Sequence, residues 1–288
     1  PYNFKNQNID DFLQNLNIDK TVEISSINGG YSNALKQLNK FIDNGYEDYA
    51  KFSSNPSKEA SSQLSPYFHS GQISTHEVFE KISNLESWTL ESIDPKMVGR
   101  REGWWGSTEN FESFMDELIT WRELGYHTCV RRANYDQYSS LPEWAIKTLT
   151  EHSSDEREHI YSLDELTYSQ THDEIWNAAQ NQLRTQGIIQ NYLRMLWGKK
   201  ILEWTPNPQI ALSYMITLND RYALDGRDPN SYSGVFWILG RYDRAWGPER
   251  SIYGKIRYMT SDSTSKKFNL KPYLEKWSNE SLGIHTTL

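Results

Sequence analysis

A buried-looking arginine followed by an acidic, turn-rich stretch is the part of this sequence best suited to chemistry. Arg194 lies in an apolar segment, where an unpaired guanidinium would carry a multi-kcal/mol penalty. It should therefore pair with a ligand or with a downstream carboxylate, and Asp225 and Asp228 are the candidates. Both belong to residues 218–234, a polar stretch between apolar helices whose side chains suit the polar edge of a cofactor.

Two predicted helices position these residues and three tryptophans. The first opens at Thr171, with Glu174 closing a capping box, and carries Trp176 in its first turns. The second spans residues 188–204 and is apolar around most of its circumference, so we expect it at the centre of the fold. Trp197 and Trp204 are seven residues apart, which puts them on one helix face about 10 Å apart along the axis.

The rest of the chain also predicts helices, so the expected fold class is all-α. Further helix starts are indicated by Ser74/Glu77, Ser140/Glu143, Ser162/Glu165 and Asn207-Pro208. Convincing alternation of period two is absent. Residues 51–62 and 94–108 are expected loops, and we divide the chain into a helical lead-in (1–48), a main domain (49–280) and a tail (281–288).

Composition narrows the class of protein. At 288 residues and 14% aromatic, the chain can bury a large core. No apolar run approaches a membrane span, and the Pro1 start shows no signal peptide, so we expect a monomer in the cytoplasm, or in the nucleus of a eukaryote. Cys129 is the single cysteine, which excludes internal disulfides, and the scattered histidines predict no metal site.

The net charge of −8 argues against nucleic acid, but the charge is unevenly distributed. The segment 237–271 favours basic over acidic residues, and its basic members are Arg241, Arg244, Arg250, Lys255, Arg257, Lys266, Lys267 and Lys271. A local basic surface that binds phosphates is one interpretation, and a solvated charged face is the other.

Several strings, in order, resemble the flavin domain of the photolyase/cryptochrome family, nearest to class II cyclobutane pyrimidine dimer photolyases. They are LSPYFHSGQIS, ELITWREL, THDEIWNAAQ, NYLRMLWGKKILEW, LNDRYALDGRDPN and DRAWGPER. The resemblance covers residues 49–273 and implies an all-helical domain that binds FAD and repairs UV-dimerised pyrimidines in DNA by light-driven electron transfer. The α/β domain that usually holds an antenna chromophore has no counterpart here, so we expect this chain to bind no antenna.

The resemblance assigns FAD contacts to two groups of residues. Serine hydroxyls and backbone amides near a helix start can hold a pyrophosphate, and the matching positions are Ser61, Ser62, Leu64 and Ser65, with Tyr49 upstream. Asn219 matches the asparagine that faces flavin N5, Asp225 the partner of Arg194 beside the ring, and Asp228 lies in the same stretch. Without the resemblance, a serine-rich loop and a network of turns would explain these residues.

The resemblance also assigns a relay and a lesion pocket. Trp197 would lie nearest the flavin, Trp176 in the middle and Trp204 toward solvent, although tryptophans at this spacing otherwise form core. The residues matching the dimer pocket and the loop that enters the DNA are Glu117, Trp121, Met195, Trp237, Arg244 and Trp246. Without the resemblance, Glu117 would be a surface carboxylate above a core tryptophan.

The sequence departs from the family pattern at residues 188–191. Ile-Ile-Gln-Asn replaces a Lys-Met-His-Gly-like run, and Asn191 resembles the class I asparagine that contacts the lesion, while Gln190 replaces a histidine. The expected function is therefore light-driven repair of cyclobutane pyrimidine dimers. A cryptochrome-like blue-light sensor and an inactive flavin-binding remnant are the alternatives, and retained Glu117, Trp121 and Met195 favour repair.

Overall fold

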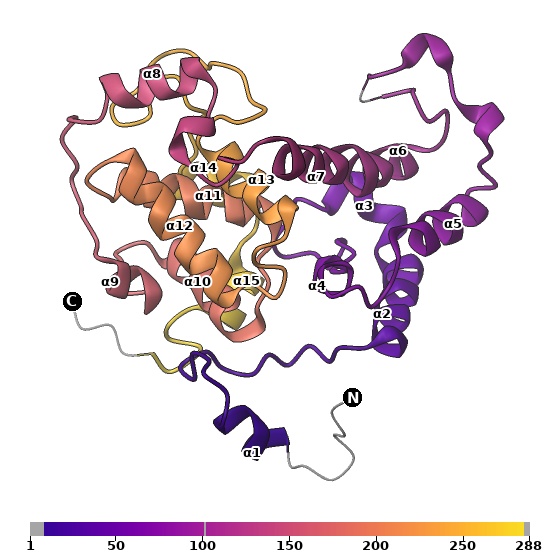
Figure 1. Ribbon diagram of the computed structural model, residues 1–288, viewed down its shortest axis with the longest axis horizontal. Helices are drawn as coiled ribbons and strands as arrows, with labels where there is room; N and C mark the ends of the chain where they lie inside the picture. The colour runs from indigo at the N-terminus through magenta and orange to yellow at the C-terminus, as the bar shows by residue number, and fades with distance from the viewer. Residues whose placement is uncertain (1–8, 101, 285–288) are drawn as a thin grey trace.

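The computed structural model describes residues 9–100 and 102–284, and the regular elements among them are helices (Figure 1). The all-α class expected from the sequence is confirmed, since the described residues form only an isolated bridge between Arg250 and Gly254 and no strand. None of the helices in this part of the chain is long and apolar enough to cross a membrane. Residues 1–8 of the expected lead-in and 285–288 of the expected tail lie outside the described residues.

The first half of the chain builds one hydrophobic cluster, the N-terminal core. Leu38 and Phe41 of the amphipathic helix α2 pack in this cluster with Tyr49, Leu64 and Phe111. The lead-in therefore shares its core with residues beyond position 49, and the domain division stays a prediction. The helices of this half are α1 (Ile9–Gln14), α2 (Tyr31–Asn44), α3 (Tyr49–Phe52), α4 (Ser65–His69), α5 (Thr75–Leu85) and α6 (Glu109–Met115).

The second half builds the larger C-terminal core around α11. This helix buries residues on most sides and packs against α10, α12 and α13, as its apolar circumference predicted. The helices of this half are α8 (Glu143–Glu151), α9 (Leu163–Thr167), α10 (Glu174–Gln186), α11 (Asn191–Glu203), α12 (Pro208–Tyr222), α13 (Pro229–Ile238), α14 (Ser261–Lys267) and α15 (Lys271–Trp277).

One continuous helical stretch joins the two cores. It runs through α6, the π-helical segment η5 (Asp116–Trp121) and α7 (Arg122–Arg131), and in Figure 1 it runs horizontally across the upper half of the molecule. Gly125 lets α7 approach α13 closely, because a Cβ there would lie 2.8 Å from the Ser233 Oγ. The π-helical segment has i→i+5 hydrogen bonding, a geometry that is often found at functional sites.

Three of the predicted helix starts are confirmed. Ser74 caps α5 by accepting from the Glu77 N–H, and Ser162 forms a capping box at α9 with Glu165. Asn207 is the N-cap of α12. These caps satisfy backbone N–H groups that the helix itself leaves without partners.

Three helix starts differ from the prediction. Asp173 caps α10 because the Thr171 hydroxyl donates to Asn177 Oδ1 at 2.8 Å instead. The helix α8 begins after Pro142, and Ser140 does not cap it because its hydroxyl donates to the Gln137 carbonyl at 2.6 Å. The helix α11 begins at residue 191 rather than 188, with Gln190 as its N-cap.

Direct polar contacts hold the two cores together. Gln190 donates from Nε2 to the Ser53 carbonyl at 2.7 Å, and His69 Nδ1 lies 3.3 Å from Asp228 Oδ2. Gln190 thus caps α11 and also fixes the end of α3. The departure from the family pattern at this position has a structural role in the described chain.

Candidate functional site

The predicted charge cluster at the start of α11 is present. Arg194 donates from Nη1 to Asn219 Oδ1 at 3.0 Å, and its Nη2 lies 3.8 Å from Asp225 Oδ1. Asn219 belongs to α12 and is 2% exposed, while Asp225 follows that helix. The structure therefore brings together three residues that the sequence separates by as many as 31 positions.

Asp225 retains an unused acceptor in this cluster. Its Oδ1 is buried and accepts no hydrogen bond from the described residues, since 3.8 Å from the guanidinium is too far for one. Buried carboxylate oxygens normally have a donor, so an unpaired one marks a place where a ligand N–H fits. The residues present here fit the polar edge of a flavin ring.

The predicted phosphate-binding turn leads directly into α4. Ser61 and Ser62 are half-buried, Leu64 is fully buried, and Ser65 is exposed as the first residue of the helix. Gln63 has a positive φ of 53°, which turns the chain sharply just before the helix. Exposed hydroxyls at a helix start are suitable donors for phosphate oxygens.

Asp228 caps a helix with one carboxylate oxygen and faces a histidine with the other. Its Oδ1 accepts from the Asn230 N–H and caps α13, and its Oδ2 faces His69 at the end of α4. Both oxygens thus have partners inside the protein. Its predicted contact with FAD remains a prediction.

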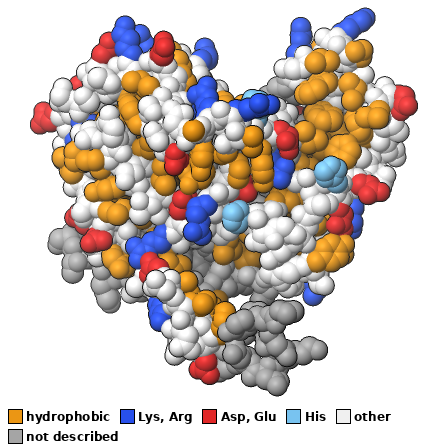
Figure 2. All heavy atoms as spheres, in the orientation of Figure 1, with side chains coloured by type: hydrophobic (Ala, Val, Ile, Leu, Met, Phe, Trp, Pro, Cys, Tyr) orange, Lys and Arg blue, Asp and Glu red, His pale blue; other side chains and the backbone are white. Residues whose placement is uncertain are grey.

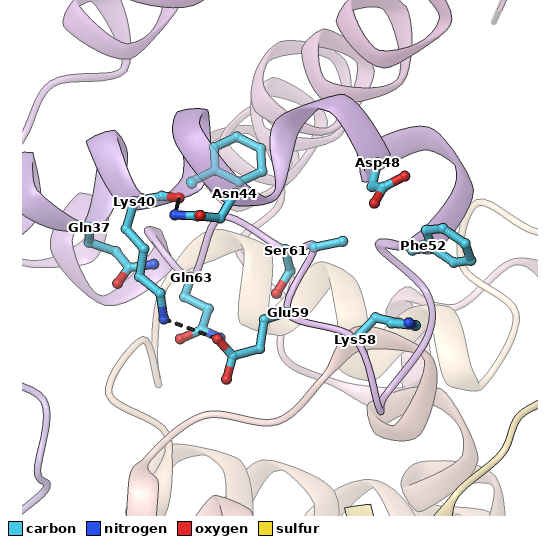
Figure 3. A pocket seen from close by; sticks show the side chains of 11 residues that line it. Gln37, Lys40, Asn44, Asp48, Phe52, Lys58, Glu59, Ser61 and Gln63 are labelled. Atoms are coloured by element: carbon cyan, nitrogen blue, oxygen red, sulfur yellow. Dashed lines mark hydrogen bonds and ion pairs between the residues drawn. The ribbon is translucent and has the colours of Figure 1, made fainter. Parts of the chain in front are cut away.

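A pocket of about 150 Å³ lies on the α2 side of the Ser61 turn (Figure 3). Lys40 from α2 points toward Glu59 across it, and their charged groups are 3.0 Å apart. Ligand pockets usually measure about 300–1,000 Å³, so this one is too small for a dinucleotide. Ser61 is the one predicted FAD contact that borders it.

The three predicted relay tryptophans lie together in the C-terminal core. Trp176 and Trp204 have ring centroids 5.6 Å apart, and the indole N–H of Trp176 donates to the Trp197 carbonyl at 2.9 Å. Trp197 donates from its own indole to Gln180 Oε1 at 2.9 Å. Trp176 therefore contacts both of the other residues, and the order of the relay stays a prediction.

Trp204 does not reach solvent, contrary to the expectation. It is 2% exposed, and Tyr161 and His172 pack edge-on against it at centroid distances of 5.4 and 5.2 Å. The Tyr161 hydroxyl and His172 Nδ1 are 2.6 Å apart, and burial raises the pKa of Tyr161 and lowers that of His172. A neutral imidazole can accept a hydrogen bond from the phenol at this distance. The sequence offered no sign of this pair.

The predicted lesion residues form an aromatic surface where η5 meets α13. The rings of Trp121 and Trp237 are 4.5 Å apart between centroids, and Tyr242 lies 6.4 and 6.2 Å from them. The Trp121 indole donates to Asp116 Oδ2 at 2.9 Å, which fixes the ring. The two indoles are in contact and inclined by 58° to each other, so they present two adjoining aromatic faces.

Glu117 is exposed on the same π-helical segment, four residues before Trp121. Burial raises the pKa of Tyr49, in the N-terminal core, above its usual range. The charges of the nearby Glu117 and Asp116 carboxylates add to that shift. Met195 is half-buried against the C-terminal core, and Asn191 is exposed at the start of α11.

The segment after α13 divides into a structural arginine and an exposed group. Arg241 is 4% exposed, stacks on Phe236 at 3.7 Å and donates to the Tyr135 carbonyl at 2.7 Å. The expectation that Arg241 contributes to a basic surface is therefore wrong. Arg244 is exposed, and its guanidinium stacks on Trp246 at 4.3 Å. The predicted DNA-entering loop therefore presents a cation over an aromatic ring.

A buried lysine connects α11, which carries Trp197, with α13, which carries Trp237. Lys199 of α11 is 2% exposed and donates from Nζ to the Ile238 carbonyl, one residue after Trp237. Burial lowers its pKa to about 7, and the nearby charge of Asp243 opposes that shift. The sequence analysis did not single out this lysine.

Solved structures share this fold. A bacterial class III photolyase from Agrobacterium tumefaciens matches with a TM-score of 0.61 and 18% identity, covering 88% of this chain and 45% of that one. A Synechocystis cryptochrome matches with a TM-score of 0.61 at 15% identity, over 91% of this chain and 48% of that one. The fold is thus that of the helical domain of photolyases and cryptochromes, as expected.

Curated relatives give higher identities. Proteins named deoxyribodipyrimidine photo-lyase match at 38% identity in Methanothermobacter thermautotrophicus, over 93% of this chain and 55% of that protein, and at 41% in Arabidopsis thaliana, over 81% and 44%. No protein-family model matches the chain. The chain belongs to the photolyase/cryptochrome family, and it spans about half the length of the curated relatives it matches.

Proposed function

We propose that this chain is a catalytic domain that binds FAD and repairs cyclobutane pyrimidine dimers in DNA under blue light. The observation that carries the proposal is the arrangement of Glu117, Trp121 and Trp237 on the outside of a helical domain whose interior holds the three tryptophans expected to form a relay. Relatives named deoxyribodipyrimidine photo-lyase support the same reaction class.

Three residues would hold the ring of FAD. Arg194, Asn219 and Asp225 form its polar edge, and the open Oδ1 of Asp225 would accept a ring N–H. The turn at Ser61 to Ser65 would hold the phosphates. Bound in its reduced form and excited by light, FAD would supply the electron that opens the cyclobutane ring and regain it afterwards.

The lesion residues have separate tasks in this proposal. Trp121 and Trp237 would stack on the flipped pyrimidines, and the exposed Glu117 would hydrogen-bond a pyrimidine edge. Arg244 and Trp246 would occupy the gap left in the duplex. The relay of Trp197, Trp176 and Trp204 would restore the reduced cofactor, with the phenol of Tyr161 close to Trp204.

The test is repair of a dimer-containing oligonucleotide by the purified, reduced protein under blue light, with a dark control. Light-dependent return of thymine absorbance supports the proposal. Photoreducible FAD without repair would favour a cryptochrome-like sensor, which needs the relay but not Glu117 or the two stacking indoles.

A further inference from the structure

The loop between α5 and α6 is anchored to the N-terminal core. Residues 86–100 and 102–108, called the arm, project from that core at the upper right of Figure 1. The Glu112 carboxylate is 6% exposed and accepts from the Gly103 and Gly106 N–H groups at 2.6 and 2.9 Å. These charge-assisted hydrogen bonds tie the C-terminal part of the arm to α6.

Aromatic packing fixes the base of the arm. The Trp88 indole donates to the Trp105 carbonyl at 2.6 Å, and the Trp88 ring stacks on Phe111 at 5.5 Å. Gly106 has a φ of +63°, and a Cβ there would lie 1.9 Å from the Ser92 carbonyl oxygen, so only glycine fits. The arm is therefore built into the N-terminal core.

The tip of the arm carries cations without protein partners. The sequence Pro-Lys-Met-Val-Gly-Arg-Arg-Glu-Gly at 95–103 has three basic residues and one acidic residue. The side chains of Lys96 and Arg100 are exposed and form no ion pair with any residue that the structure describes. Val98 between them is 63% exposed. In a chain of net charge −8, two exposed cations that form no ion pair within the described residues fit an anionic partner.

The anchor of the arm and the lesion surface belong to one helical stretch. Figure 2 shows a hollow between the arm and the C-terminal half, with Lys and Arg side chains on both of its rims. The anchor Glu112 and the indole of Trp121 share one helical stretch, nine residues or about 13 Å apart along its axis. DNA carries a phosphate every 3.4 Å or so along each strand, so this span corresponds to only a few nucleotides.

We infer that the arm binds the sugar-phosphate backbone of DNA a few nucleotides from the damaged site, with Lys96 and Arg100 contacting phosphates. The inference rests on the proposed function and extends it to a second contact, made by the arm in addition to the one proposed for Arg244. The arm gives no base-specific readout, because phosphate contacts position the duplex and carry no sequence information.

The test measures binding of a dimer-containing duplex in the dark over a range of salt concentrations. Each phosphate contact contributes about 0.9 to the slope of log K against log salt, so Lys96→Ala/Arg100→Ala should lower the slope by about 2. The matched control is Lys36→Ala/Lys276→Ala, which removes two exposed lysines on α2 and α15 and should leave the slope unchanged.

A second pair of variants tests whether the arm must be anchored. Glu112→Gln weakens the anchor and should weaken DNA binding several-fold without changing FAD content, whereas Glu109→Gln on the same helix should have no effect. If Lys96→Ala/Arg100→Ala keeps the wild-type salt slope and repair is intact, the inferred contact of the arm with DNA is wrong and the proposed function is unaffected. A wild-type protein that neither prefers damaged DNA nor repairs it overturns both.

Discussion

Tryptophans occupy two very different environments in this protein. Trp176 and Trp197 are 0% and 2% exposed, and each indole N–H has a buried acceptor. Trp121 and Trp237 are half-buried, contact each other and are open on one side. The difference separates two uses of one side chain: a ring sealed from water can pass an electron, and a ring open to solvent can stack on a base.

Removing a sealed ring should have the largest effect. Trp197→Phe should abolish most of the photoreduction of bound FAD by an external thiol, because the relay loses the ring closest to the Arg194 cluster. It should also destabilise the fold by about 1–3 kcal/mol, since Gln180 Oε1 loses its donor in a buried site. Photoreduction is followed by absorbance, with Trp144→Phe as the control. Unchanged photoreduction would rule out the relay.

A change on the open side should affect repair alone. Glu117→Ala removes a charged hydrogen-bonding group worth about 1.5–3 kcal/mol, or roughly 10- to 100-fold in repair rate. FAD content and photoreduction should stay at wild-type levels because Glu117 is exposed. Glu123→Ala on α7, where the side chain is 64% exposed, is the control. An equal loss of repair and flavin would indicate a structural role instead.

The charge cluster between the two regions can be tested by Arg194→Met. This change leaves Asp225 buried without its cation and should cost about 3 kcal/mol in unfolding free energy, together with part of the bound FAD. Denaturant melts and the flavin spectrum measure both effects. Arg194→Lys should recover part of the stability, and a full set of wild-type values in Arg194→Met would show that the pairing is unimportant.

An effect that appears only with pH should come from Lys199, the lysine that connects α11 with α13. The folded pKa of Lys199 is about 7 and its ordinary value is 10.5, so between these values the unfolded chain binds more protons. Stability should therefore rise with pH in this range, with a slope of at most about 1.4 kcal/mol per pH unit. Lys199→Met should remove this rise. A slope that persists in the variant would assign it to another group.

The sequence predicted helix existence better than helix boundaries. The helix α11 could be predicted because apolar residues lie around most of its circumference. The Arg194–Asp225 pair could be predicted because a cation in such a helix needs a partner. The predicted N-cap of α10 was wrong because the Thr171 hydroxyl bonds to the side chain of Asn177, six residues later. Such local competition between hydrogen bonds is invisible in a cap motif.

Contacts between distant residues account for what the sequence could not show. Tyr242 joins the two open indoles from a left-handed backbone conformation with φ of 63°, for which the sequence carries no signal. Arg241 looked like a surface cation and is buried because carbonyl and aromatic groups from far along the chain surround it. Trp204 is likewise covered by residues distant in the sequence, Tyr161 and His172.

The π-helical segment also sets the direction of the side chains that it carries. A π turn holds more residues than an α turn, so removing a single residue from η5 would let the stretch return to α-helical winding while α6 and α7 keep nearly their present orientation. Glu112 and the arm it holds would stay in place, whereas side chains inside the segment would point in new directions. The direction of the Glu117 carboxylate therefore depends on one short departure from α-helical winding.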